Sequence, residues 1–345
     1  MSRSFLTPMT PSTILGVEYA GDYPIAVSLS REEFAERVRA LKARLSVCDL
    51  CPHRCGIDRL RDEMGRCRVG AQAHIAAACD HHGEEPVLSG TRGSGTIFVA
   101  GCNLRCVYCQ NDRISQGKPA EYPAATAEEL AATYLRLQAL GVHNLNWVSP
   151  TQVVPQLVEA LALAIPRGLR LPIVYNSNGY DSISVLRLLD GVVDIYLPDL
   201  KYADDVIAQR LSGAPGYPDV AIAAIADMYR QVGNVQLDDD GIARRGVIVR
   251  HLVLPHRLAG TREILRRLAE EVSPDITVSL MAQYYPTFLA GSVPELNRTI
   301  TADEYEDALE AFADAGLENG WAQEPHAAPE NYRPDFAETH PFEPR

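Results

Sequence analysis

The segment Gly101-Cys102-Asn103-Leu104-Arg105-Cys106-Val107-Tyr108-Cys109-Gln110-Asn111 decides the fold of this chain, because it holds three thiols in a CxxxCxxC spacing. Thiolates are soft ligands that select zinc, copper(I) or the iron of iron–sulfur clusters. A closed structural zinc site needs four ligands, and no cysteine follows Cys109 in the chain. Three cysteines leave one iron of a 4Fe-4S cluster with open coordination, which predicts that this iron binds something other than protein.

The residues before the cysteines predict where this loop lies. Thr96 to Ala100 form a short run rich in β-formers, and the glycine-rich stretch 89–95 before it is typical of a turn. The cysteines therefore occupy the loop that follows a strand. Loops at the carboxyl ends of parallel strands carry the chemistry of barrel enzymes.

Composition excludes several classes of protein. The chain has 345 residues, of which 46% are hydrophobic and 22% charged, as in an ordinary globular protein. Its net charge of −13 disfavours nucleic acid and anionic membranes as partners. No apolar run approaches a membrane span and the amino terminus is unlike a signal peptide, so we expect a cytoplasmic protein. All eight cysteines lie in the first third of the chain, which favours metal sites over disulfides.

A second group of cysteines precedes the loop. Cys48, Cys51, Cys55 and Cys67 follow a C-x2-C-x3-C-x11-C pattern, and four thiols suit either tetrahedral zinc or a closed auxiliary iron–sulfur cluster. Four free thiols are the alternative. The stretch from Cys79 to Pro86 also contains Cys, His and Glu, but its spacing matches no metal motif and we interpret it as a structural turn.

The rest of the chain alternates predicted strands and helices. Capping boxes predict helices after Ser30, Thr126 and Thr301. The expected strands cover 96–100, 142–148, 172–177, 192–198, 246–254 and 276–282, and the other expected helices cover 152–165, 183–190, parts of 203–232, and 260–271. Such alternation implies a parallel sheet, and six units predict an α/β fold with an open (β/α)6 partial barrel. The expected division is a helical and Cys-rich metal-binding segment at 1–75, the barrel at 76–323 and a Pro-rich tail at 324–345.

The motif GCNLRCVYCQN resembles the signature of the radical S-adenosylmethionine (SAM) enzymes, in their pyruvate formate-lyase activating enzyme branch. The motifs GSGTIF, HNLNWVSPT, YNSNGY, DIYLPDLKY, RGVIVRHLVLP and SLMAQYYP resemble, in order, the strand motifs of an activating-enzyme-like family of unassigned substrate. The resemblance extends from about Cys48 to Gln323. It implies that Cys102, Cys106 and Cys109 hold a 4Fe-4S cluster whose open iron chelates the amino and carboxylate groups of SAM.

The resemblance also implies further contacts to SAM. Arg250 matches the arginine that meets the methionyl carboxylate, although a barrel arginine in a salt bridge is the alternative reading. Ser177 and Asn178 match the position at the ribose hydroxyls, where ordinary turn residues are equally expected. Tyr108 occupies the aromatic position beside adenine.

Three positions depart from the family pattern. Asp199 matches an aspartate that holds a monovalent cation in some activating enzymes, but Asn176 replaces the second acid. Gln283 replaces a histidine that relatives direct at the ribose. The glycine-glycine-glutamate motif that meets the SAM amino group is absent, and Ser149 or Thr151 is the expected oxygen acceptor in its place.

The resulting hypothesis is a radical SAM oxidoreductase. Its cluster would reduce SAM to a 5′-deoxyadenosyl radical that abstracts hydrogen from a protein or peptide, with the backbone glycine of a glycyl radical enzyme as one candidate. The resemblance implies an electron donor of flavodoxin or ferredoxin type. Radical modification of a small molecule, an iron–sulfur electron-transfer or sensor protein that never cleaves SAM, and a zinc protein with two structural cysteine groups are the alternatives.

Overall fold

The parallel sheet is the centre of the computed structural model, which describes residues 2–4, 24–324, 334–336 and 340–342. The strands pair in the order β1-β11-β10-β9-β7-β6-β5-β3-β2-β4, and the seven from β11 to β3 are mutually parallel. The strands are β1 (Ser2–Ser4), β2 (Ala73–His81), β3 (Ser94–Val99), β4 (Ala124–Ala125), β5 (Leu145–Val148), β6 (Ile173–Asn176), β7 (Ile195–Tyr196), β8 (Gln236–Leu237), β9 (Ala243–Leu252), β10 (Thr277–Met281) and β11 (Gly320–Gln323). The predicted mixed α/β fold with a parallel sheet is confirmed.

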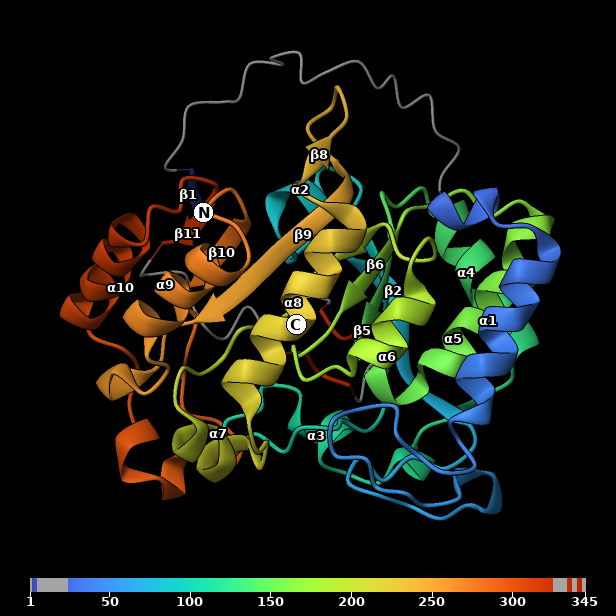
Figure 1. The fold of residues 1–345 in the computed structure, drawn as a ribbon, viewed down its shortest axis with the longest axis horizontal. Coiled ribbons are helices and arrows are strands. Elements are labelled where there is room, and N and C mark those ends of the chain that lie inside the picture. The colour runs from blue at the N-terminus through green and yellow to red at the C-terminus, as the bar shows by residue number, and fades with distance from the viewer. Residues whose placement is uncertain (1, 5–23, 325–333, 337–339, 343–345) are drawn as a thin grey trace.

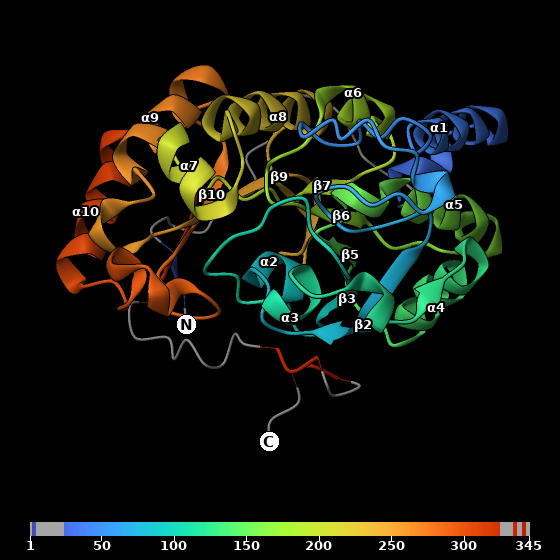
Figure 2. The same cartoon turned by 90° about the horizontal axis from the view of Figure 1, so that it is seen from below.

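Helices cover the outer side of the sheet, whose strands follow an arc (Figures 1 and 2). The helices are α1 (Arg31–Ala43), α2 (Pro86–Ser89), α3 (Asp112–Ser115), α4 (Ala127–Ala139), α5 (Val154–Ala164), α6 (Ile183–Leu186), α7 (Asp205–Ser212), α8 (Tyr217–Val232), α9 (Thr261–Glu271) and α10 (Ala302–Asp314). All three predicted capping boxes are present, at Ser30, Thr126 and Thr301, so the sequence fixes the first residue of α1, α4 and α10.

The central strands are buried on both faces. Every residue of β3, β5 and β6 is buried, as expected where helices cover one side of a parallel sheet and side chains fill the other. Their interior side chains include Trp147 and Tyr175, both fully buried. This packing holds the carboxyl ends of the strands in fixed relative positions, and the loops that leave those ends are therefore well placed to form a site.

The sequence analysis did not predict five strands, β1, β2, β4, β8 and β11, of which β2 and β11 flank the predicted strands directly. Strand β2 pairs antiparallel to β3, and it includes Cys79 to His81, which we had interpreted as part of a turn, so that interpretation is wrong for these three residues. Strand β2 is rich in alanine and has few β-branched residues, so propensity alone gave no signal. Strand β11 adds to β10 in parallel after α10, and its four residues are too few to show a period.

The Cys-rich segment between α1 and β2 lies at the end of the sheet where α3 and α7 also lie (Figure 1). Helix α1 packs on α5, and Lys42 forms an ion pair of 2.8 Å with Glu159 of that helix. Within the described ranges, no helix is long and apolar enough to cross a membrane. Residues 5–23 and most of the predicted tail lie outside the described residues.

Candidate active site

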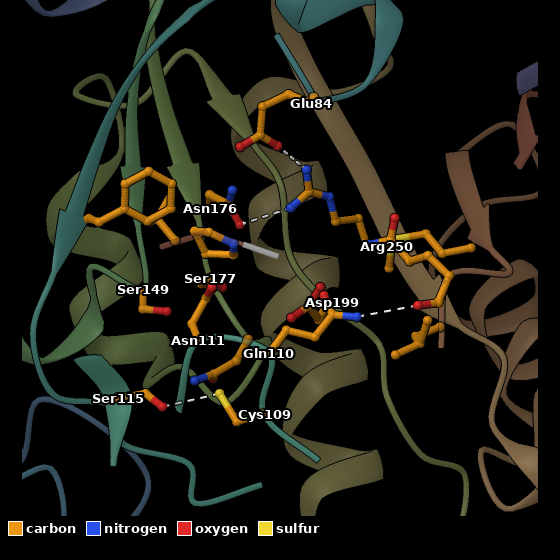
Figure 3. Close-up of a pocket in the computed structure, with 18 of the residues that line it drawn as sticks. Glu84, Cys109, Gln110, Asn111, Ser115, Ser149, Asn176, Ser177, Asp199 and Arg250 are labelled. Atoms are coloured by element: carbon orange, nitrogen blue, oxygen red, sulfur yellow. Dashed lines mark hydrogen bonds and ion pairs between the residues drawn. The ribbon is translucent and has the colours of Figure 1, made fainter. Parts of the chain in front are cut away.

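One cavity of about 410 Å³ opens where the parallel strands end (Figure 3). Its walls come from the loops after β3, β5, β6, β7, β9 and β10, which are far apart in the sequence. Ten of the eleven residues that we predicted for the cluster and for SAM line it: Cys102, Cys106, Cys109, Tyr108, Ser149, Ser177, Asn178, Asp199, Arg250 and Gln283. The exception is Thr151, which is buried outside the cavity and donates its hydroxyl to Asp181 at 2.7 Å, so Ser149 is the better placed of the two expected acceptors.

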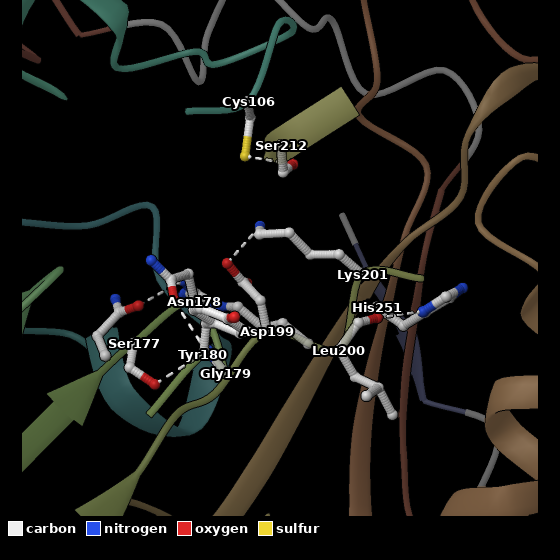
Figure 4. Close-up of polar contacts among 12 residues, drawn as sticks. Cys106, Ser177, Asn178, Gly179, Tyr180, Asp199, Leu200, Lys201, Ser212 and His251 are labelled. Carbon is white, nitrogen blue, oxygen red and sulfur yellow. Dashed lines mark hydrogen bonds and ion pairs between the residues drawn. The ribbon is translucent and has the colours of Figure 1, made fainter. Parts of the chain in front are cut away.

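Each of the three loop cysteines faces one polar side chain. Asn178 Nδ2 donates to Cys102 Sγ at 3.4 Å, and Ser212 Oγ donates to Cys106 Sγ at 3.0 Å (Figure 4). Ser115 Oγ lies 3.1 Å from Cys109 Sγ (Figure 3). Hydrogen bonds of this kind stabilise thiolates. Sequence reasoning missed both serines, since neither is part of a cysteine motif.

Burial acts in the opposite direction on these thiols. It raises the pKa of Cys106 and raises that of Cys109 to about 11, with the neighbouring sulfur of Cys106 adding to the effect on Cys109. Burial likewise raises the pKa of Cys102, and Cys106 and Cys109 raise it further. Three mutually close, buried sulfurs stay protonated unless a cationic centre binds them, which is the condition that an iron–sulfur cluster meets.

Ser177 and Asn178 belong to a hydrogen-bonded loop that is fastened to the cluster loop. Asn178 Nδ2 donates to Asn103 Oδ1 at 2.6 Å, and Asn103 Nδ2 donates to the carbonyl of Tyr180 at 2.8 Å. The hydroxyl of Ser177 donates to Asp181 at 2.6 Å. These bonds give both predicted ribose-contact residues a positioning role as well, because they fix the loop after β6 against Cys102.

Arg250 lies between two glutamates that the sequence interpretation had assigned to a turn. Its Nε and one terminal nitrogen donate to both carboxylate oxygens of Glu85 at 2.7 Å each, and it also pairs with Glu84 (Figure 3). Burial alone would lower the pKa of Arg250, but the two carboxylates hold it well above its usual range. Arg250 is therefore salt-bridged, as the alternative interpretation of this residue expected. It also lines the cavity.

A second ion pair lies beside Cys106. Lys201 Nζ contacts Asp199 Oδ2 at 2.6 Å (Figure 4). Burial acts to lower the pKa of Lys201, but Asp199 and the sulfur of Cys106 outweigh it and raise the pKa. Lys201 thus stays charged, and Asp199 has a protein cation as its partner.

Of the remaining predicted SAM contacts, Tyr108 and Gln283 already have hydrogen-bond partners in the protein. The Tyr108 hydroxyl lies 2.5 Å from that of Tyr202, and burial raises its pKa well above the usual value. Gln283 Oε1 accepts a hydrogen bond of 2.8 Å from Gln323 of β11. Ser149 has a left-handed backbone with φ of 54°, which is uncommon outside glycine and turns its side chain toward the cavity (Figure 3).

The four amino-terminal cysteines do not line this cavity and surround a second, smaller one. Cys79 lies in β2, where it packs with Phe98 and Val148 away from both groups. Nowhere in the described ranges do three or more His, Cys, Asp or Glu side chains form a group that could hold a single metal ion. Part of the carboxyl-terminal tail closes the side of the large cavity, where Phe342 stacks on His81 with ring centroids 3.8 Å apart.

Comparison with known proteins identifies the family. A model described as the radical SAM superfamily matches residues 96–237, which include the cysteine loop. The chain is 32% identical over 281 residues to the uncharacterized protein MJ0674 of Methanocaldococcus jannaschii, an alignment that covers 79% of this chain and 76% of that protein. The chain belongs to the radical SAM superfamily. Proteins of this superfamily are enzymes that use a 4Fe-4S cluster and SAM.

More distant similarities extend over parts of this radical SAM chain. The uncharacterized protein MJ0808 of the same organism is 27% identical over 183 residues, which cover 49% of this chain and 52% of that protein. Among solved structures, Streptococcus suis SuiB bound to its precursor peptide SuiA aligns with 14% identity and a TM-score of 0.43, over 65% of this chain and 47% of SuiB. The [FeFe]-hydrogenase maturase HydG aligns with 10% identity and a TM-score of 0.41, over 86% of this chain and 64% of HydG.

The cavity fits the two cofactors of the superfamily. Three cysteines are the only thiols among its lining residues, so a cluster held there would keep one iron open. A volume of about 410 Å³ lies in the range of roughly 300–1,000 Å³ that is typical of small-molecule sites. The polar lining from the ends of β5, β6, β7, β9 and β10 contains both hydrogen-bond donors and acceptors, as a polar ligand such as SAM requires.

Proposed function

We propose that this protein is an activating-enzyme-like radical SAM oxidoreductase that abstracts a hydrogen atom from a protein or peptide in the cytoplasm. The backbone glycine of a glycyl radical enzyme is the substrate class that the resemblance favours. In this proposal the parallel sheet is a partial radical SAM barrel, and residues 1–75 form a helical and Cys-rich metal-binding segment beside it.

The observation that carries the proposal is the convergence of ten predicted residues on one cavity. Four of them, Cys102, Cys106, Tyr108 and Cys109, come from one loop, and the other six come from the ends of five further strands, up to 174 residues away from Cys109 to Gln283. Sequence proximity cannot produce such a grouping. A cluster site with an adjoining polar cavity is the arrangement that SAM chemistry needs.

When bound, the cluster and SAM supply reductive cleavage of the sulfonium and a 5′-deoxyadenosyl radical. The chain's own residues bind and orient these groups. The three cysteines hold the iron, and Asn178, Ser212 and Ser115 stabilise their thiolates. Lys201 keeps a positive charge beside Cys106 through its pair with Asp199.

We assign the recognition of SAM to the part of the cavity wall around Arg250, Glu84 and Glu85. Arg250 would meet the methionyl carboxylate while its pairs with Glu84 and Glu85 fix the guanidinium plane. Those glutamates also supply carboxylates, the group that the missing glycine-glycine-glutamate motif would have provided. Glu84 therefore joins Ser149 as a candidate to accept hydrogen bonds from the SAM amino group. Burial by the tail residue Phe342 would help to exclude water.

Anaerobic reconstitution with iron and sulfide, followed by dithionite and SAM, tests this function. We expect 5′-deoxyadenosine from the intact chain and none from Cys106→Ala. The matched control is Cys79→Ala, which removes a buried cysteine outside the cavity and should keep the activity. Nucleoside at the level of Cys106→Ala from a protein that carries its cluster would reject the proposal. With 5′-deoxyadenosine established, deuterium transfer into it from a labelled glycyl radical enzyme tests the substrate class.

A further inference from the structure

The four amino-terminal cysteines line one small enclosed cavity. Cys48, Cys51, Cys55 and Cys67 all border a space of about 10 Å³, room for about one water molecule. A β-carbon at Gly65 would lie only 2.7 Å from Cys55 Sγ, so glycine is required where the backbone passes this sulfur.

One buried donor at the border of this cavity lacks a partner within the described ranges. Arg66 Nε is buried without a hydrogen bond, and Arg66 lines the cavity. Arg59 is also fully buried there, and one of its terminal nitrogens lies 4.0 Å from Cys48 Sγ. A buried guanidinium N–H without an acceptor is costly, and an anionic occupant would satisfy it. A metal centre with four thiolates is such an anion.

The walls of this small cavity touch the cluster loop directly. Gln152 donates to the carbonyl of Gly101 at 2.8 Å, one residue before Cys102. His53 belongs to the same Cys-rich segment without lining the cavity, and its Nε2 lies 2.9 Å from the carbonyl of Asn103, one residue after Cys102. Arg66 donates to the carbonyl of Ser212 at 3.3 Å, and the hydroxyl of Ser212 donates to Cys106 Sγ. Hydrogen-bonded routes therefore connect the surroundings of the two cysteine groups.

We propose that Cys48, Cys51, Cys55 and Cys67 hold a closed auxiliary iron–sulfur cluster that passes electrons to the cluster at Cys102, Cys106 and Cys109. The metal site stands on the residues alone, and the electron route rests on the proposed function. One electron moves from a low-potential donor protein to the auxiliary cluster and then to the cluster at Cys102, Cys106 and Cys109. No bond forms or breaks in this transfer.

The arrangement of the four sulfurs favours a cluster over a single zinc ion. Tetrahedral zinc holds four sulfurs at about 2.3 Å from the metal. Within the described residues, these cysteines do not form a group that could hold a single ion. Four protein ligands also leave no open iron, so the auxiliary cluster is suited to electron transfer and not to binding a substrate.

Positive charge beside the segment suits an acidic donor protein. Arg66 and Arg68 flank Cys67 and Arg105 precedes Cys106, and all three are at least partly exposed. This group comes from the Cys-rich segment and from the cluster loop, on a chain whose net charge is −13. Oppositely charged patches accelerate the association of electron-transfer partners.

Metal analysis after anaerobic reconstitution with Fe²⁺ and sulfide tests the second cluster. We expect about eight irons per intact chain and about four in the variant Cys102→Ala/Cys106→Ala/Cys109→Ala, which keeps the amino-terminal group. The variant Cys48→Ser/Cys51→Ser/Cys55→Ser/Cys67→Ser should also retain about four. Cys79→Ala should retain about eight, because it changes a cysteine outside both groups.

The Cys102→Ala/Cys106→Ala/Cys109→Ala variant decides the outcome even if the variant without the amino-terminal cysteines fails to fold. One zinc and no iron in the Cys102/Cys106/Cys109 variant, or no metal at all, would overturn the proposal. Electron paramagnetic resonance tests the electron route: the reduced intact chain should show broadening from two interacting clusters, and each group variant should lose it. Two clusters without magnetic interaction would refute the route. Two interacting clusters in a chain that fails to cleave SAM would refute only the proposed function.

Discussion

Removing the hydroxyl of Ser212 should lower the reduction potential of the cluster at Cys102, Cys106 and Cys109. Ser212 is fully buried and donates to Cys106 Sγ at 3.0 Å. Reduction adds negative charge to the cluster and strengthens this bond, so the bond favours the reduced state. Its loss should therefore make the cluster harder to reduce, and no water can take the place of the hydroxyl at a site with 0% exposure.

The size of the effect follows from the charge on the acceptor. A hydrogen bond to a charged group contributes about 1.5–3 kcal/mol in total. If about 1 kcal/mol of this differs between the two oxidation states, the one-electron potential of Ser212→Ala falls by about 40 mV, because 59 mV corresponds to a factor of ten. Ser115→Ala should give a smaller fall, since Ser115 is 9% exposed and water can replace its hydroxyl beside Cys109.

A redox titration followed by electron paramagnetic resonance measures this shift on the reconstituted protein without SAM. Each serine variant is also made in the Cys48→Ser/Cys51→Ser/Cys55→Ser/Cys67→Ser background, where the amino-terminal cysteine group contributes no signal. Ser292→Ala is the matched control, because that exposed hydroxyl bonds only the carbonyl of Leu289 and should leave the potential unchanged. An unchanged or raised potential in Ser212→Ala, with iron content intact, would refute the reasoning.

Three further changes test other parts of the structure. Arg250→Gln should lower the unfolding free energy of the SAM-free protein in urea by about 3–5 kcal/mol, because Glu84 and Glu85 lose their buried partner. Adding Glu84→Gln and Glu85→Gln to this variant should restore most of the lost stability. An unchanged stability in Arg250→Gln would contradict the structural role of the pairs and leave Arg250 with a role toward SAM alone. Burial raises the pKa of Asp194 from 3.8 to about 7, so the folded state binds a proton that the unfolded state lacks and urea stability should fall by up to about 4 kcal/mol from pH 4 to 7, a slope that Asp194→Asn should remove. Gly101→Ala should cost at least about 1–2 kcal/mol and lower the iron content, because Gly101 has φ of 83° and a β-carbon would lie 2.8 Å from the carbonyl oxygen of Cys67; an intact iron content would contradict this.

The sequence predicted the parts of the fold that depend on neighbouring residues. Three capping boxes located the starts of α1, α4 and α10, since a cap is a contact across three residues. The cysteine loop was likewise evident after β3. Strand β2 and strand β11 were missed because their pairing depends on β3 and β10, and neither has a pattern of its own.

The partners inside the site were unpredictable for the same reason. Glu84 and Arg250 are 166 residues apart, and nothing in HGEEP or in the strand around Arg250 indicates that the two meet. Ser212 ends α7 and reads as an ordinary helix terminus, yet it faces Cys106. The resemblance supplied the positions proposed to contact SAM, while only the fold supplied the residues that hold those positions in place.

The charges around the large cavity explain why these partners are needed. Glu84, Glu85 and Asp199 carry three negative charges, and Arg250 and Lys201 carry two positive ones, so the fixed groups sum to about one negative charge. Iron binding adds three thiolates together with a cationic iron–sulfur core, and SAM brings a sulfonium and an ammonium against a single carboxylate. The protein's excess negative charge therefore complements a cationic nucleotide. Without its two glutamates, Arg250 would instead repel the sulfonium, which is a physical reason for the HGEEP segment to lie against β9.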